Sequence, residues 1–208
     1  PDVLYHGSNR LFVSQDRGQS WTIVSPDLST NNPQKTVRGA SGGLTPDNSG
    51  AETHGAISTL SISPLDPGVI WAGTDDGNVQ VTRDGGQTWS NTRAAITGVP
   101  EGIWVSRVEA SHHKVGTAYV SFDGHRSDRF EPWVFMTSDF GRSWTSLSSG
   151  LPNGQVVRVV REDLRNPDLL FAGTEFAVFA SLDRGATWHR FMGKMPSVST
   201  MDLVIHPR

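Results

Sequence analysis

Acidic residues gather with histidine and arginine in two long segments, 25–55 and 122–132. Carboxylates hydrogen-bond to sugar hydroxyls, aromatic rings stack on sugar faces, and a pair of carboxylates can hydrolyse a glycosidic bond. These residue types therefore predict a carbohydrate site, for binding or for hydrolysis. The candidates in and beside the two segments are Asp47, Asn48, Glu52, His54, Asp123, His125, Arg126 and Asp128.

Shorter loops add four candidates, namely Asp75, Asp76, Trp104 and Glu175. Glu52, Asp123 and Asp75 are the candidates for a catalytic role. Several candidates also have an ordinary structural explanation: "TDDGN" (74–78) is a typical tight turn, "DGHRSD" (123–128) is typical of a solvated loop, and His54 opens a strand. The sequence has no Cys and no recognisable metal-ligand or phosphate-loop spacing, so we expect no metal and no cofactor.

One octapeptide, Ser/Thr-x-Asp-x-Gly-x-Ser/Thr-Trp, occurs at 14–21, 82–89, 137–144 and 181–188. Its Asp can accept backbone N–H groups of its own turn, its Gly permits positive φ, and its Trp can bury a large ring. We therefore predict that the octapeptide fastens a hairpin and binds no ligand. Its residues are Asp16, Gly18, Trp21, Asp84, Gly86, Trp89, Asp139, Gly141, Trp144, Asp183, Gly185 and Trp188.

Strand-length apolar runs separated by turn residues precede each octapeptide, as in "AISTLSISP" (56–64), "VIWAGT" (69–74) and "VQVT" (79–82). Four short strands per unit predict an all-β fold, a β-propeller of four-stranded antiparallel blades. The units span about 1–24 plus 199–208, 56–92, 103–148 and 155–192, with 25–55 inserted as a long loop. Antiparallel order places the candidate loops on the face opposite the octapeptides.

The octapeptides and their flanking strands resemble the Asp-box (bacterial neuraminidase repeat) family, which includes sialidases, sortilin, xyloglucanases and a photosystem-assembly factor. The resemblance covers nearly the whole chain and implies a propeller in which the box lies away from the active site. It implies a glycan- or protein-binding scaffold module of an exported bacterial protein, extracellular or periplasmic. The alternatives are a xyloglucanase-like glycoside hydrolase, or a fragment of one, and a sortilin-like sorting or assembly propeller. With Tyr5 and Tyr119 as its tyrosines and no Arg-Ile-Pro motif, the sequence argues against a sialidase.

The two ends of the chain look like parts of one unit. Residues 2–8 read as a second strand, and residues 199–208 read as a first strand with its turn. The tail either closes a four-bladed ring or belongs to an arc whose strand edges, at 2–8 and 199–206, pair with another copy or with further blades. A net charge of −3 with scattered basic residues argues against nucleic acid, and no apolar run is long enough to cross a membrane.

Overall fold

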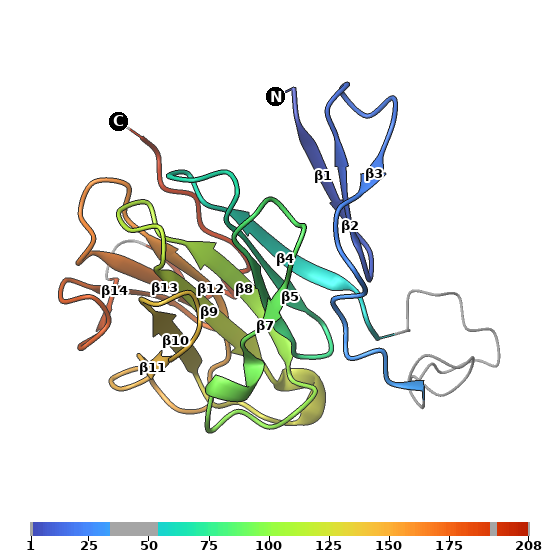
Figure 1. The fold of residues 1–208 in the computed structure, drawn as a ribbon. Helices are drawn as coiled ribbons and strands as arrows, with labels where there is room; N and C mark the ends of the chain where they lie inside the picture. Colours follow the sequence, from blue (N-terminus) through green and yellow to red (C-terminus); the bar gives the residue numbers. More distant parts are fainter. Residues whose placement is uncertain (1, 34–53, 192–194, 208) are drawn as a thin grey trace.

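The computed structural model describes residues 2–33, 54–191 and 195–207, which form four antiparallel sheets in a row (Figure 1). The first sheet holds β1 (Leu4–Gly7), β2 (Leu11–Ser14) and β3 (Thr22–Ile23). The second holds β4 (Ile57–Ile62), β5 (Ile70–Thr74), β6 (Val79–Thr82) and β7 (Ser90–Asn91). The third holds β8 (Trp104–Ala110), β9 (Ala118–Asp123), β10 (Trp133–Thr137) and β11 (Thr145–Ser146). The fourth holds β12 (Val157–Glu162), β13 (Leu170–Thr174), β14 (Val178–Ser181) and β15 (His189–Arg190).

Within each sheet the strands follow chain order, so every sheet is a meander of hairpins. Successive sheets lie face against face, and the first strands β4, β8 and β12 contact one another across the sheets. This arrangement is that of propeller blades, which confirms the predicted all-β fold. Two short 3-10 turns, η1 (Arg93–Ala95) and η2 (His125–Ser127), lie in connections between strands.

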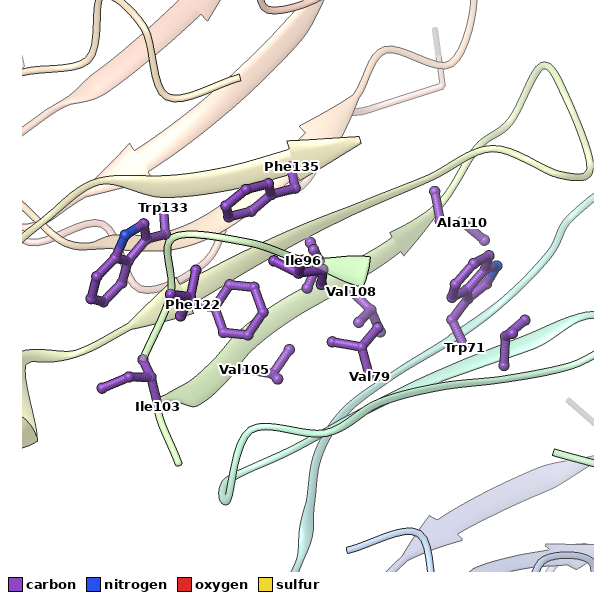
Figure 2. Close-up of a cluster of buried hydrophobic side chains, with 14 of the residues drawn as sticks. Trp71, Val79, Ile96, Ile103, Val105, Val108, Ala110, Phe122, Trp133 and Phe135 are labelled. Carbon is purple, nitrogen blue, oxygen red and sulfur yellow. The ribbon is translucent and has the colours of Figure 1, made fainter. Parts of the chain in front are cut away.

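The apolar strand residues pack between neighbouring sheets. Trp71 from β5, Val105 from β8 and Phe122 from β9 are fully buried in one cluster, which Figure 2 shows together with Trp133 and Phe135 from β10. A second cluster, which includes Tyr119 and Trp188, fills the space between the third and fourth sheets. Burial on both faces explains why these strands are apolar at successive positions and do not simply alternate.

Each octapeptide joins the last two strands of its sheet, which are the third and fourth strands in the three four-stranded sheets, as predicted, and β2 and β3 in the first sheet. In the second sheet, Asp84 Oδ1 accepts from Thr82 Oγ1 at 2.7 Å and from the Thr88 N–H at 2.9 Å, while its Oδ2 accepts from Thr88 Oγ1 at 2.5 Å. The hydroxyl of Thr82 in turn accepts from the N–H of Gly86. The other three octapeptides make the same set of bonds.

These bonds hold the pKa of all four box aspartates at about 2, the largest cause being the hydroxyl bond from the Ser or Thr four residues later. The carboxylates are therefore committed to their own turns.

The box glycine has two roles. It adopts positive φ, which is +104° for Gly86, and it makes room for the preceding sheet, because a Cβ added to Gly86 would lie 2.3 Å from the Val24 carbonyl oxygen. The sequence indicated the first role and gave no sign of the second.

The box tryptophan also contacts the preceding sheet. In the fourth sheet Trp188 is 6% exposed, and its Nε1–H donates to Leu147 O at 2.8 Å. Trp21 of the first sheet is 43% exposed, so the predicted burial of the ring does not extend to it.

One expectation for the chain ends, and one of the two alternatives left open for the tail, differ from the structure. The described tail, 195–207, contains no strand, although 199–208 was expected to form one. It also does not join the first sheet: it lies against the fourth sheet, where the Thr200 N–H donates to Thr174 O and Arg161 Nε donates to Leu203 O. The first strand of a blade forms a hydrogen-bonded ladder with the second strand of the same blade. None of the described residues forms such a second strand beside the tail.

Candidate functional site

The loops of the sheets lie on two opposite faces. In each four-stranded sheet the box bonds to the loop between the first and second strands, as when the N–H of Gly85 donates to Gly68 O and the N–H of Arg184 donates to Asp168 O. We call the opposite face the mouth face. It carries the loops between second and third strands, such as 75–78, 124–132 and 175–177, and the connections between sheets, such as 92–103.

A guanidinium organises the mouth face where the third and fourth sheets meet. Nη1 of Arg158, on β12, donates to Asp123 Oδ2 at 2.6 Å, and Nη2 donates to Glu175 Oε2. The Asp123 side chain is 0% exposed at the end of β9, whereas Glu175 is 32% exposed in the loop after β13. Arg158 therefore joins one buried and one partly exposed carboxylate from two sheets.

The next loop extends this arrangement. Asp123 Oδ1 accepts from the backbone N–H of His125 at 3.0 Å and lies 2.8 Å from its Nδ1. The guanidinium carbon of Arg126 sits 4.5 Å from the centre of the Trp104 ring, a cation–π contact. Trp104 is itself opposite Asp123 in the β8–β9 ladder. We call Trp104, Asp123, His125, Arg126, Arg158 and Glu175 the Arg158 cluster.

An aromatic side chain and a hollow adjoin the cluster. Phe176 follows Glu175 directly and has an exposed ring. It lines a cavity of about 370 Å³ together with Gln155, Phe179 and Arg190. The mouth face thus combines charged groups that can bond to hydroxyls with an exposed ring that can stack.

Several predicted residues hold the connection between the first two sheets instead. Asp75 Oδ1 accepts from the backbone N–H groups of Gly55 and Ala56, at 2.8 and 2.9 Å. Asp76 is buried, and its Oδ2 accepts from the N–H and the hydroxyl of Thr30. Both aspartates therefore act as turn and connection residues in this structure.

The remaining predicted residues are more scattered. His54 lies beside this connection, and its buried Nδ1 has no hydrogen-bond partner among the described residues. Asp128 is exposed at the end of η2, with a φ of 56°. The candidates Asp47, Asn48 and Glu52 lie outside the described residues. No group of three or more His, Asp or Glu side chains in the described ranges is placed to hold a metal ion.

Sequence reasoning missed Arg158. The first strands of the other two complete sheets have Ser58 and Ser106 at the equivalent position, and each hydroxyl donates to a carbonyl of the next first strand. In "VRVVRE" (157–162) this position holds a long cation in a strand that is otherwise mostly apolar. Aligning the repeated strands would have singled it out.

A second buried acid was also missed. Glu162, at the end of β12, accepts from the hydroxyls of Ser111 and Tyr119 and from the backbone N–H of His112. Burial, reinforced by the Glu162 charge, raises the pKa of Tyr119 well above its usual value. The network ties the third sheet to the fourth on the box side of the molecule, so we assign it a structural role.

Comparison with known proteins agrees with the geometry of the boxes. Residues 80–91 match the model of the BNR/Asp-box repeat family. The other three octapeptides make the same hydrogen bonds as the one within the matched residues. Over 162 residues, 71% of this chain, it is 27% identical to the oligoxyloglucan-reducing end-specific xyloglucanase of Emericella nidulans, of which the match covers 16%.

Solved structures match the fold. An ancestral GH74 enzyme superimposes with a TM-score of 0.64 at 15% identity, covering 93% of this chain and 23% of that one. The GH74 xyloglucanase from Xanthomonas campestris gives a TM-score of 0.62 at 20% identity, covering 91% of this chain and 28% of that one. This chain therefore spans less than a third of the length of each of these relatives. Within the described residues, no helix is long and apolar enough to cross a membrane.

Proposed function

We propose that this Asp-box chain is a non-catalytic glycan-binding segment of a propeller, and that it binds xyloglucan-type oligosaccharides on its mouth face at the Arg158 cluster. The observation that carries the proposal is that a single guanidinium engages both carboxylates of the cluster, Asp123 and Glu175.

This engagement favours binding over catalysis. Glycoside hydrolysis uses two carboxyl groups on either side of the scissile bond, one of them free to give up a proton to the leaving oxygen. Here Asp123 is enclosed and bonded to both Arg158 and His125, so it faces its own neighbours and not a substrate. Glu175 is more exposed and can accept from sugar hydroxyls while Arg158 holds it in place.

The glycan class comes from the relatives. The Emericella nidulans relative and the Xanthomonas campestris structure are both xyloglucanases by name. An exposed ring such as that of Phe176, beside charged groups, also suits a sugar ligand. The proposal includes an extracellular or periplasmic location, where a large polysaccharide is encountered. No contact in the described residues favours the alternative of a sortilin-like sorting role.

Titration calorimetry with xyloglucan oligosaccharides tests the proposal. Phe176→Ala should weaken binding about tenfold, the equivalent of about 1.4 kcal/mol, through loss of stacking. Glu175→Ala should weaken it by a similar factor. Leu182→Ala is the matched control, because Leu182 is exposed on the box side. Equal effects of all three variants, or no binding by the wild type, would refute the proposal.

The second candidate function is glycoside hydrolysis, favoured by the sequence similarity to a xyloglucanase over 162 residues. Chromatography of the same oligosaccharides after long incubation separates the two functions. We expect no products. Products that Glu175→Gln or Asp123→Asn abolishes would establish the hydrolase and overturn the non-catalytic assignment.

A further inference from the structure

Two phenylalanine rings are exposed on the mouth face, one in each of the two loops that Arg158 joins. Phe130 is 45% exposed in the loop that follows Asp123, and Phe176 is 50% exposed directly after Glu175. Among the described residues of the mouth-face loops and connections, these two are the large apolar side chains left exposed. Each ring therefore belongs to the same loop region as one of the two carboxylates that Arg158 engages.

The loop that carries Phe130 is folded against itself. The N–H groups of Ser127 and Arg129 donate to Gly124 O, at 2.8 and 3.0 Å. A Cβ added to Gly124 would lie 2.7 Å from the Arg129 Cβ, so these two residues are in close contact. Phe130, the next residue, is thereby held near Asp123, which directly precedes Gly124. A ring presented by an ordered loop loses little conformational freedom when a ligand binds to it.

The ring of Phe176 is tied to the same guanidinium. Arg158 donates to Asp123 from Nη1 and to Glu175 from Nη2, and Phe176 is one residue beyond Glu175. Consecutive Cα atoms are only about 3.8 Å apart, so both rings begin close to the Arg158 contacts. One ring comes from the third sheet and the other from the fourth, with the guanidinium between their loops. A sugar unit that stacks on Phe176 and bonds to Glu175 therefore leaves the ring of Phe130 to a different unit.

We propose that Phe130 is a second stacking platform, and that the ligand of the mouth face is an extended glucan chain that lies across both rings. The inference rests on the proposed function, from which it takes the class of sugar. Two contacts on one chain reinforce each other, because binding at the first raises the effective concentration of the chain at the second. The site therefore selects for chain length: an oligosaccharide that reaches one platform binds less tightly than one that reaches both.

Titration calorimetry with two probes tests the inference, namely a xyloglucan oligosaccharide of one repeat and one of two consecutive repeats. The wild type should bind the longer probe at least about tenfold more tightly. Phe130→Ala and Phe130→Leu should abolish this preference, while the affinity for the shorter probe changes by less than about twofold. Phe130→Tyr should keep the preference, because it keeps the ring. Trp21→Ala is the matched control and should behave like the wild type, because it removes a ring that is 43% exposed in a box turn.

The outcomes separate this inference from the proposed function. If the wild type binds both probes with equal affinity and Phe176→Ala weakens both, the proposed function stands and the second platform is overturned. Retention of the preference by Phe130→Leu would also overturn it, because stacking needs the flat face of a ring. A wild type that binds neither probe would overturn the proposed function and this inference together. Thermal unfolding of the Phe130 variants should match that of the wild type, since the ring is exposed.

Discussion

Replacing Arg158 with Met leaves the Asp123 carboxylate, which is fully enclosed, without its guanidinium partner. The Arg158 side chain is itself only 10% exposed, so little solvent screening weakens the pair. Breaking a buried ion pair by removing one partner costs about 3–5 kcal/mol, because an uncompensated charge stays buried. We therefore expect the Arg158→Met free energy of unfolding, measured by urea titration, to fall by about that amount.

A matched control and a second variant sharpen this experiment. Arg129→Met removes an exposed pair with Glu131 at 3.4 Å, and such pairs contribute about 0–1 kcal/mol. Adding Asp123→Asn to Arg158→Met should recover at least about 1 kcal/mol, because the buried charge is removed. A loss of less than about 1 kcal/mol for Arg158→Met, or no recovery in the double variant, would refute the assignment of Arg158 as the centre of the cluster.

Three further predictions concern the boxes. The folded pKa of the four box aspartates is about 2, below the usual value of 3.8, so their contribution to stability is complete above about pH 4 and is lost as the pH falls through 2. Thermal unfolding across this pH range should show the decline. Gly86→Ala should lower the free energy of unfolding by more than about 2 kcal/mol, because it combines positive φ with a clash against backbone. Gly85→Ala has open space at its Cβ position and should cost only about 1–2 kcal/mol. Denaturant titration of the two variants measures this difference. Trp188→Ala should cost about 3–5 kcal/mol and Trp21→Ala clearly less, because Trp21 is already 43% exposed; equal losses in calorimetry would contradict this.

Local patterns were enough to predict the fold. Alternating runs such as 79–82 coincide with strand β6, and the octapeptide predicted its own hairpin, because the Asp, Gly and Ser/Thr bonds lie within eight residues. The contacts between sheets could not be predicted from the sequence. That Gly86 faces Val24, and that Trp21 differs from Trp188 in burial, depends on which sheet comes before each box in space.

The site was predicted less completely for the same reason. Trp104, Asp123, His125, Arg126 and Glu175 were chosen from loops, and the structure brings them together. Arg158 was missed because it is the second residue of strand β12, where its charge stands out only once the repeats are aligned. Asp75 and Asp76 are in the expected loop, but they bond to the long connection between the first two sheets, a contact that spans up to 46 residues of sequence.

The central claim is that the boxes only fasten hairpins and that the mouth face binds ligand. The most direct test is a ¹H–¹⁵N NMR titration of the chain with a xyloglucan oligosaccharide. We expect the shifted amides to cluster around Arg158, Glu175 and Phe176, while the amide signals of the four boxes stay in place. Shifts centred on Asp16, Asp84, Asp139 or Asp183 would contradict it.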